Sequence, residues 1–201
     1  MFVRHAESAA AHPGVPFPVI EGGHADPPLH PDGERQAEAV GARLAAEAVT
    51  GLYVTPLVRT HQTAAPLAAR LGLEPVVIPE LREVHMGEWE GGEFRIRFAR
   101  HDPLALRVLR EQRWDLIPGA EPMAAMRARV RAGLRRVLDA TAPGTTAVVV
   151  GHGAVIAELL HQATGSEPFA FVQIANGSIS RLVVRPSGRQ VLQSFNETAH
   201  L

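Results

Sequence analysis

The sequence predicts an α/β fold: a three-layer α/β/α sandwich with a mostly parallel central sheet and a small inserted helical cap. Short apolar runs rich in β-branched residues alternate with longer segments in which apolar residues recur every three or four positions. Such alternation is typical of parallel strands whose helices cover the sheet. One irregular segment, rich in glycine, proline and charge, interrupts this pattern at 84–120. We therefore expect a single domain over residues 1–201 with a cap insertion at 84–120.

Each predicted element has its own pattern. Strands are indicated by short apolar runs that end at a polar residue, a glycine or a proline, and helices by apolar residues along one side. The clearest amphipathic helix has methionine, valine and leucine spaced by three or four residues. In chain order we expect a strand at 2–4, a helix at 33–47, a strand at 52–55, a helix at 57–71, a short strand at 75–79, the amphipathic helix at 121–140, a strand at 145–150, a helix at 154–165, and a closing hairpin of strands at 179–185 and 189–195.

The composition excludes several classes of protein. A hydrophobic fraction of 46% and a formal net charge of −1 fit neither a disordered chain nor a nucleic-acid coat. No apolar run reaches the roughly 18 residues of a membrane span, and no signal-peptide pattern is seen, so we expect a cytoplasmic protein. The chain has no cysteine, and all 20 of its basic residues are arginine. A cysteine nucleophile, a Walker-type phosphate loop and a pyridoxal Schiff base are therefore excluded.

Chemically versatile side chains follow two of the predicted strands. Arg4 and His5 come directly after the first apolar residues, and His152 lies between two glycines after the strand at 145–150. Burying polar groups so close to a strand costs free energy unless they form hydrogen bonds or ion pairs or bind a ligand. Because ligands of α/β sheets bind beyond the carboxyl ends of the strands, we expect these two places to meet.

Five sequence blocks resemble the motifs of the histidine phosphatase superfamily, also called phosphoglycerate mutase-like. FVRHAES is similar to its Arg-His-Gly-Glu signature, and DPPLHPDGERQAEAVGARL to its loop and Gly-x-x-Gln-Ala helix. YVTPLVRTHQTA resembles its Ser-Pro-Leu-x-Arg-x-x-x-Thr-Ala block, LREVHMGEWEG its Leu-x-Glu…Gly-x-Trp-Glu-Gly block, and VVVGHGAVI its Gly-His-Gly turn. The blocks follow the family order and cover most of the chain except 93–118, which makes the set far more specific than any one block.

The resemblance implies a phosphomonoester hydrolase that acts through a phosphohistidine on a small anionic phosphorylated metabolite. His5 would attack phosphorus through one ring nitrogen, while a carbonyl holds the proton of the other nitrogen. His152 would donate to the phosphate, and Glu83 would protonate the departing alkoxide and then accept a proton from water. Because this carboxyl must be protonated in the first step, we expect catalytic activity to be highest at mildly acidic to neutral pH.

The same resemblance implies the groups that bind the phosphate. Arg4 and Arg59 would each present a planar fork to two phosphate oxygens, and Gly153 would line the site. Thr63 and Asn176 could add neutral contacts, although a structural role is the better interpretation for both. No cofactor is implied.

Three positions depart from the family pattern. Ala11 stands where an asparagine phosphate ligand is common, Ala6 where glycine is common, and His30 where threonine is common. They bear on the contacts of the loop at 8–30 and remove none of the charged or imidazole groups. We expect no metal site, because the spacings of the three histidines in that loop (His12, His24 and His30) are not those of metal ligands.

The segment at 84–120 bears on the substrate. It contains more arginine than acid, which indicates either a solvated surface or a mouth that attracts anionic esters. Trp89 and Phe94 could add an apolar wall. The six arginines concerned are Arg95, Arg97, Arg100, Arg107, Arg110 and Arg113.

Two alternatives stay open at this stage: a cofactor-dependent phosphoglycerate mutase, and a phosphate-binding protein without catalysis. Mutases of the family carry a longer insertion between the glutamate and second histidine blocks, so the short segment here favours hydrolysis. The expected partner is a small-molecule phosphate ester, with no nucleic acid or membrane, and a homodimer is possible.

Overall fold

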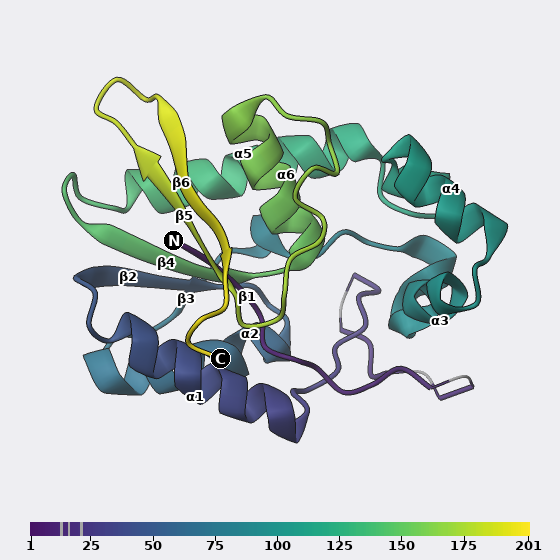
Figure 1. Ribbon diagram of the computed structural model, residues 1–201, viewed down its shortest axis with the longest axis horizontal. Helices are drawn as coiled ribbons and strands as arrows, with labels where there is room; N and C mark the ends of the chain where they lie inside the picture. Colours follow the sequence, from purple (N-terminus) through teal and green to yellow (C-terminus); the bar gives the residue numbers. More distant parts are fainter. Residues whose placement is uncertain (13, 16, 21) are drawn as a thin grey trace.

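A six-stranded sheet forms the middle layer of the computed structural model, which describes residues 1–12, 14–15, 17–20 and 22–201 (Figure 1). The strand order is β3-β2-β4-β1-β5-β6. β1, β2, β3 and β4 pair in parallel, whereas β5 runs antiparallel to β1 and forms a hairpin with β6. The strands are β1 (Phe2–Arg4), β2 (Val49–Val54), β3 (Val76–Val77), β4 (Thr146–Gly151), β5 (Ile179–Val184) and β6 (Gln190–Glu197). The predicted, mostly parallel sheet is confirmed.

Helices cover both faces of this sheet, which confirms the three-layer architecture. α1 (Pro31–Leu44) and α2 (Val58–Leu71) lie on one face, and α5 (Met123–Asp139) and α6 (Gly153–Thr164) lie on the other (Figure 1). α1 begins two residues before the predicted helix, because proline suits the first helical position and the His30 ring accepts a hydrogen bond from the backbone N–H of Asp32 at 3.2 Å.

Strand residues alternate between two apolar clusters. Phe2 and Val149 pack on the side of α5 and α6, whereas their neighbours Val3 and Val148 pack on the side of α1 and α2. All four side chains are at most 4% exposed. Fully burying a side chain of this kind stabilises the fold by about 1.5–3 kcal/mol, so both faces of the short strand β1 are anchored.

The segment at 84–120 forms a cap at one end of the sheet (Figure 1). The sequence pattern there is irregular, yet the segment contains two short helices, α3 (Glu93–Ala99) and α4 (Pro103–Glu111), between the 3-10 turns η2 (Gly87–Gly92) and η3 (Trp114–Leu116). The two ends of the cap are tied together: Glu88 N–H donates to the Pro118 carbonyl at 2.9 Å, and Glu121 N–H to the His85 carbonyl at 2.9 Å.

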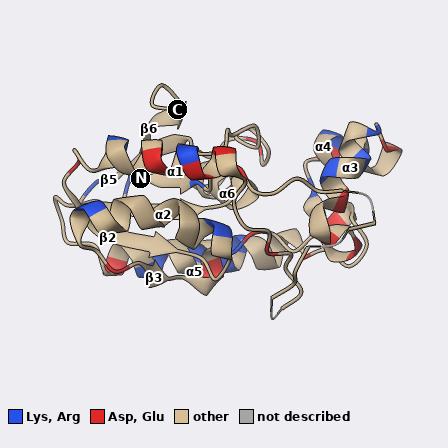
Figure 2. Cartoon of the chain, turned by 90° about the horizontal axis from the view of Figure 1, so that it is seen from below, with Lys and Arg blue, Asp and Glu red and all other residues tan. Residues whose placement is uncertain are grey.

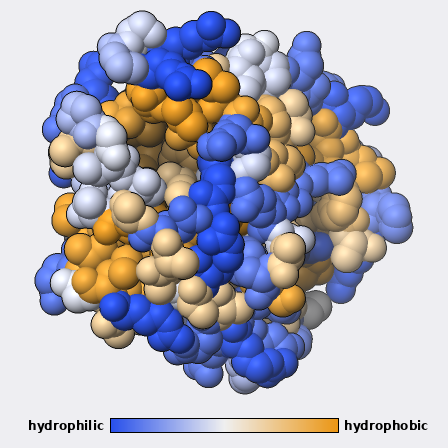
Figure 3. Space-filling model, turned by 60° about the vertical axis from the view of Figure 1, so that its left-hand side comes forward, coloured by the Kyte–Doolittle hydropathy of each residue, from blue (hydrophilic) through white to orange (hydrophobic). Residues whose placement is uncertain are grey.

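Acidic and basic residues are interspersed over both the body and the cap (Figure 2). The end of the molecule away from the cap, turned forward in Figure 3, is mainly hydrophilic with hydrophobic patches and a hollow among them. None of the helices built by the described residues has the length and apolar character that a bilayer crossing needs.

Candidate active site

The register between β1 and β4 creates the site. Arg4 pairs with Gly151 in parallel strands, so the next residues, His5 and His152, leave the sheet side by side. Their ring centroids lie 5.3 Å apart with an interplanar angle of 60°. The two places that the sequence predicted to meet are therefore brought together by main-chain pairing.

The His5 ring is buried, and one of its nitrogens is committed. Nδ1 lies 2.7 Å from the carbonyl oxygen of Ala6, which can only accept, so Nδ1 carries the ring proton and Nε2 keeps its lone pair. Burial, followed by the charges of Arg59 and Arg4, holds the pKa of His5 well below its ordinary value. The ring is therefore neutral at physiological pH, which is the state that can act as a nucleophile.

Backbone contacts fix the position of this ring. The Thr63 hydroxyl accepts from the Ala6 N–H at 3.0 Å and donates to the Arg59 carbonyl at 2.7 Å. The Asn176 amide donates to the His5 carbonyl at 2.9 Å. Thr63 and Asn176 thus have the structural role that the sequence analysis favoured.

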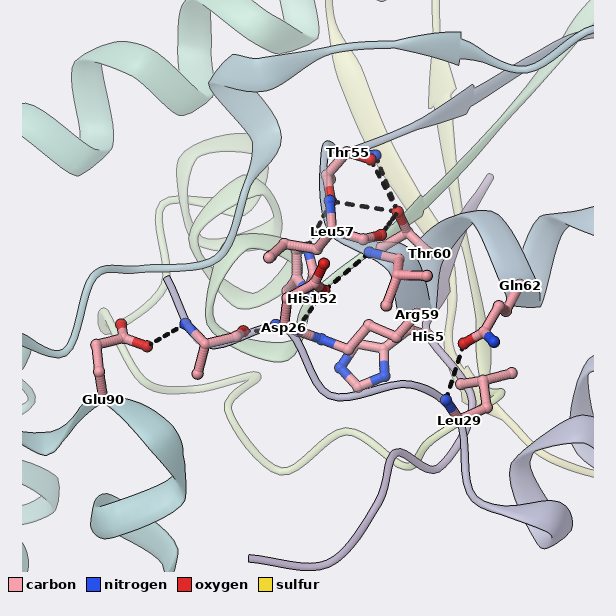
Figure 4. Close-up of polar contacts among 12 residues, drawn as sticks. His5, Asp26, Leu29, Thr55, Leu57, Arg59, Thr60, Gln62, Glu90 and His152 are labelled. Carbon is pink, nitrogen blue, oxygen red and sulfur yellow. Dashed lines mark hydrogen bonds and ion pairs between the residues drawn. The ribbon is translucent and has the colours of Figure 1, made fainter. Parts of the chain in front are cut away.

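His152 is fully buried and is oriented by threonines (Figure 4). Its Nε2 lies 2.8 Å from the Thr55 hydroxyl, which follows the last residue of β2. The Thr60 hydroxyl proton goes to the Leu57 carbonyl at 2.8 Å, and Thr55 Oγ1 accepts from the Leu57 N–H at 3.3 Å. The Thr55 proton can then go to Nε2, and in that arrangement the ring proton of His152 lies on Nδ1. That nitrogen is buried and has no hydrogen-bond partner among the described residues.

Two guanidinium groups flank the rings. Arg4 donates to the Ile174 carbonyl, and its Nε is buried without a partner in the described part of the chain. Arg59 lies in the first turn of α2, donates to the Ala25 carbonyl at 3.1 Å and lies 3.6 Å from the Asp26 carboxylate (Figure 4). The pKa of each guanidinium is lowered, chiefly by burial. Two desolvated cations with donors to spare make a strong site for a small anion.

Glu83 lies at the rim of the same site. One of its carboxyl oxygens accepts from the Val84 N–H at 3.0 Å. Burial raises the pKa of this carboxyl, while the charges of Arg59 and Arg4 oppose the rise. A carboxyl with a raised pKa keeps its proton to a higher pH than a free glutamate does, which suits a group that both donates and takes up a proton.

Arg129 of α5 holds the chain segment that carries Glu83. Its Nη1 donates to the carbonyls of Glu80 and Arg82 at 2.8 and 2.6 Å, and its Nη2 to the carbonyl of Glu83 at 3.1 Å. Nε and Nη2 also form a two-pronged ion pair with Glu121 at 2.6 and 2.7 Å. All five guanidinium N–H groups are used, and the two side chains are only 11% and 13% exposed. This clamp joins α5, the end of the cap and the segment of Glu83.

A cleft of about 490 Å³ opens over these groups, between the sheet and the cap. Five of the six predicted site residues line it: Arg4, His5, Arg59, Glu83 and Gly153. The sixth, His152, is buried beneath them, and its ring packs against the His5 ring, which lines the cleft. Gly153 and Ala154, the first residues of α6, also line the cleft, and the helix dipole favours an anion at this end of the helix.

Residues 1–198 match the sequence model of the histidine phosphatase superfamily (branch 1). The chain belongs to this superfamily. A probable phosphoglycerate mutase GpmB from Yersinia enterocolitica is 32% identical over 89% of this chain and 86% of its own length.

Solved structures share the histidine phosphatase fold. The complex of a mycobacterial glucosyl-3-phosphoglycerate phosphatase with inorganic phosphate has a TM-score of 0.79 at 24% identity, over 100% of this chain and 97% of that one. A putative alpha-ribazole-5'-P phosphatase from Escherichia coli has a TM-score of 0.76 at 22% identity, over 98% and 94%. The resemblance predicted from the five blocks is confirmed, as is the fold class.

The structure places two further residues at the candidate site that the sequence analysis missed. Thr55 follows a strand, as His5 and His152 do, so the same strand-end argument could have found it. Arg129 lies three residues after the buried Met126 and four before the buried Gly133. A charged residue on the buried side of an amphipathic helix was the available signal.

The cap arginines form a largely solvated surface rather than a basic mouth. Of the described arginines in the cap, Arg95 alone lines the cleft. The pairs formed by four others are Arg97 with Glu93 and Asp102, Arg107 and Arg110 with Glu111, and Arg113 with Asp115. Trp89 and Phe94 do line the cleft, and both also pack into the core beneath the cap.

Proposed function

We propose that the protein is a phosphomonoesterase that transfers the phosphoryl group of a small ester first to His5 and then to water. The observation that carries the proposal is the state of the His5 ring. Its Nδ1–H donates to the Ala6 carbonyl, its pKa is lowered, and Nε2 is left as the nucleophile beside two guanidinium groups.

The first step forms the phosphohistidine. Nε2 of His5 forms a bond to phosphorus as the ester P–O bond breaks, and the departing oxygen takes the proton of Glu83. Arg4, Arg59, the Nδ1–H of His152 and the Gly153 N–H would stabilise the charge on the phosphoryl oxygens. Preorganised donors stabilise the transition state most effectively, because they need no reorientation as charge develops on these oxygens.

The second step releases phosphate. Water attacks phosphorus, the P–N bond breaks, and its electron pair returns to Nε2 of His5. The Glu83 carboxylate takes a proton from the attacking water, which restores the acid for the next turnover. Neither step calls for a metal or another cofactor, so we propose that the reaction uses none.

A rapid-quench experiment with ³²P-labelled phenyl phosphate tests the proposal. We expect a labelled protein whose phosphate is stable in base and labile in acid, and we expect both label and turnover to be lost in His5→Asn. The matched control is His12→Asn, which changes a histidine of the same loop that does not line the cleft. Full turnover in His5→Asn would refute the mechanism, and tight phosphate binding without turnover of any ester would favour a non-catalytic binding protein.

A mutase remains the second candidate, because relatives such as the Yersinia enterocolitica protein are named probable phosphoglycerate mutases. A mutase must return the phosphoryl group before water reaches it. We expect hydrolysis of 3-phosphoglycerate to exceed its conversion to 2-phosphoglycerate, with and without 2,3-bisphosphoglycerate. Faster isomerisation that depends on the bisphosphate would reverse the assignment.

The partner and location follow from the same proposal. We propose a small-molecule ester as the only required partner, with no role for nucleic acid, and we expect the enzyme to act in the cytoplasm. A homodimer is a prediction that light scattering would test, and cell fractionation would test the location.

A further inference from the structure

The cleft has two chemically unlike halves. Its floor holds the groups to which phosphate chemistry is assigned: Arg4, His5, Arg59 and Glu83. The rest of the lining is dominated by large apolar side chains from the loop before α1 and from the cap: Phe17, Trp89, Phe94, Phe98, Leu109 and Trp114. A phosphate on the floor accounts for the first half only.

The apolar half is already assembled. Phe94 stacks on Phe98 with ring centroids 6.3 Å apart and planes 13° from parallel. It also meets Trp114 edge to face at 5.5 Å, and Trp114 packs on Phe169 at 4.6 Å. Rings held in this way form an apolar wall that requires little ordering when a ligand binds, which lowers the entropic cost of association.

One ring of this wall is unusually exposed. Phe98 retains 44% exposure, whereas Trp114 retains only 5%. Covering an exposed aromatic ring with an apolar group removes water from both surfaces and is favourable in proportion to the area covered. Contact between this wall and a flat apolar group of the ligand would therefore contribute favourably to the free energy of binding.

Charge is scarce in the same half. Arg95 is the only cation among the described lining residues besides Arg4 and Arg59. Its charge acts on both of these guanidinium groups and on His5, which associates it with the phosphate end. The carboxylate of Glu90 is occupied by the N–H groups of Ala25 and Met86 at 3.0 and 2.8 Å. A second anionic group on the substrate would therefore lack a cation of its own.

We propose that the wall formed by Phe94, Phe98 and Trp114 binds the organic part of the substrate, so that the enzyme prefers phosphomonoesters with a flat apolar group. Esters with a second anionic group, such as phosphoglycerates, are the poorer substrates. This inference rests on the proposed function for its phosphate end. Arg95 serves the phosphoryl group rather than a separate carboxylate.

Three primary alkyl phosphates with closely similar leaving groups test the preference: propyl, 3-phenylpropyl and 3-carboxypropyl phosphate. We expect kcat/KM for 3-phenylpropyl phosphate to exceed that for propyl phosphate by about 10- to 100-fold, the range that burial of one aromatic ring supplies. The carboxypropyl ester should be the poorest of the three.

Two cap substitutions locate the effect. Phe98→Ala should lower the ratio of phenylpropyl to propyl activity by about 3- to 10-fold. Leu106→Ala is the matched control, because Leu106 is 41% exposed on α4 but does not line the cleft, and the ratio should not change. Arg95→Gln should lower kcat/KM for all three esters by a similar factor.

Binding of phosphonates separates this inference from the proposed function. By calorimetry, 3-phenylpropylphosphonate should bind about 10- to 100-fold tighter than propylphosphonate, whether or not the esters are turned over. Equal affinities, or a preference for the carboxypropyl ester that Arg95→Gln abolishes, would overturn the inference. Absence of turnover with the affinity difference intact would overturn only the proposed function.

Discussion

Replacing Arg129 should impair turnover in a way that depends on the leaving group. Arg129 touches no phosphate-binding residue, yet it holds the carbonyls of Glu80, Arg82 and Glu83 and the carboxylate of Glu121. In Arg129→Met these five hydrogen bonds are lost. The segment that carries Glu83 then keeps the ion pair of Glu80 with Arg136 of α5 but loses the guanidinium that holds its backbone carbonyls.

The magnitude follows from what Glu83 supplies. General acid catalysis contributes typically 10²- to 10⁴-fold, and a displacement of about 1 Å can cost about 100-fold. We expect kcat for propyl phosphate, whose alkoxide must be protonated, to fall by about 100-fold. For p-nitrophenyl phosphate, whose phenolate leaves without a proton, the fall should be less than about 5-fold.

The substitution also affects the stability of the fold, and this must be measured separately from its effect on turnover. Breaking a buried ion pair by removing one partner costs about 3–5 kcal/mol, so Arg129→Met should lower the free energy of unfolding by about that amount. In the double variant Arg129→Met/Glu121→Leu neither charge is left alone, and much of the stability should return. The loss of propyl phosphate turnover should persist, because Arg129 still does not hold the three carbonyls.

The assay is steady-state kinetics on both esters, with Glu83→Gln as the reference for complete loss of the acid. Glu83→Gln should show the same dependence on the leaving group, only larger. Equal losses on the two esters in Arg129→Met, or full recovery in the double variant, would refute the positioning argument. A weak effect on both esters would show that the chain holds Glu83 without the clamp.

Three further predictions concern the site and its support. Thr55→Val should lower kcat by about 10- to 100-fold while Thr55→Ser restores it, since an unpaired buried nitrogen of His152 costs about 1–3 kcal/mol; unchanged kinetics would contradict the proton assignment. The lowered pKa values of His5 and His152 mean that below about pH 6.5 the unfolded chain binds protons that the folded chain refuses. Urea unfolding should therefore show stability falling below pH 6.5 by up to about 1.4 kcal/mol per pH unit for each ring, and His5→Gln/His152→Gln should flatten this slope. Gly33→Ala would place a Cβ 2.0 Å from the Glu7 carbonyl oxygen and should destabilise the fold by about 1–3 kcal/mol, measured as a lower urea midpoint.

The order of strands and helices was largely predictable from the sequence. Hydrophobic periodicity located all four helices of the sandwich to within a few residues, and β-branched runs located the strands. Both signals are local, because each element must show an apolar face before it can be buried. The cap was harder to predict, since α3 and α4 are short and their apolar residues are divided between the core and the cleft.

The sequence by itself pointed to the arginines, histidines and glutamate of the candidate site, because His5 and His152 follow predicted strands and five family blocks are read directly from the residues. It also determined what the site could not contain, since cysteine and lysine are absent. Only the tertiary structure decided that β1 lies next to β4 with Arg4 opposite Gly151, and that Arg129 reaches across to the segment of Glu83. Those contacts join residues far apart in the chain, and no local pattern specifies them, because they depend on how whole elements pack.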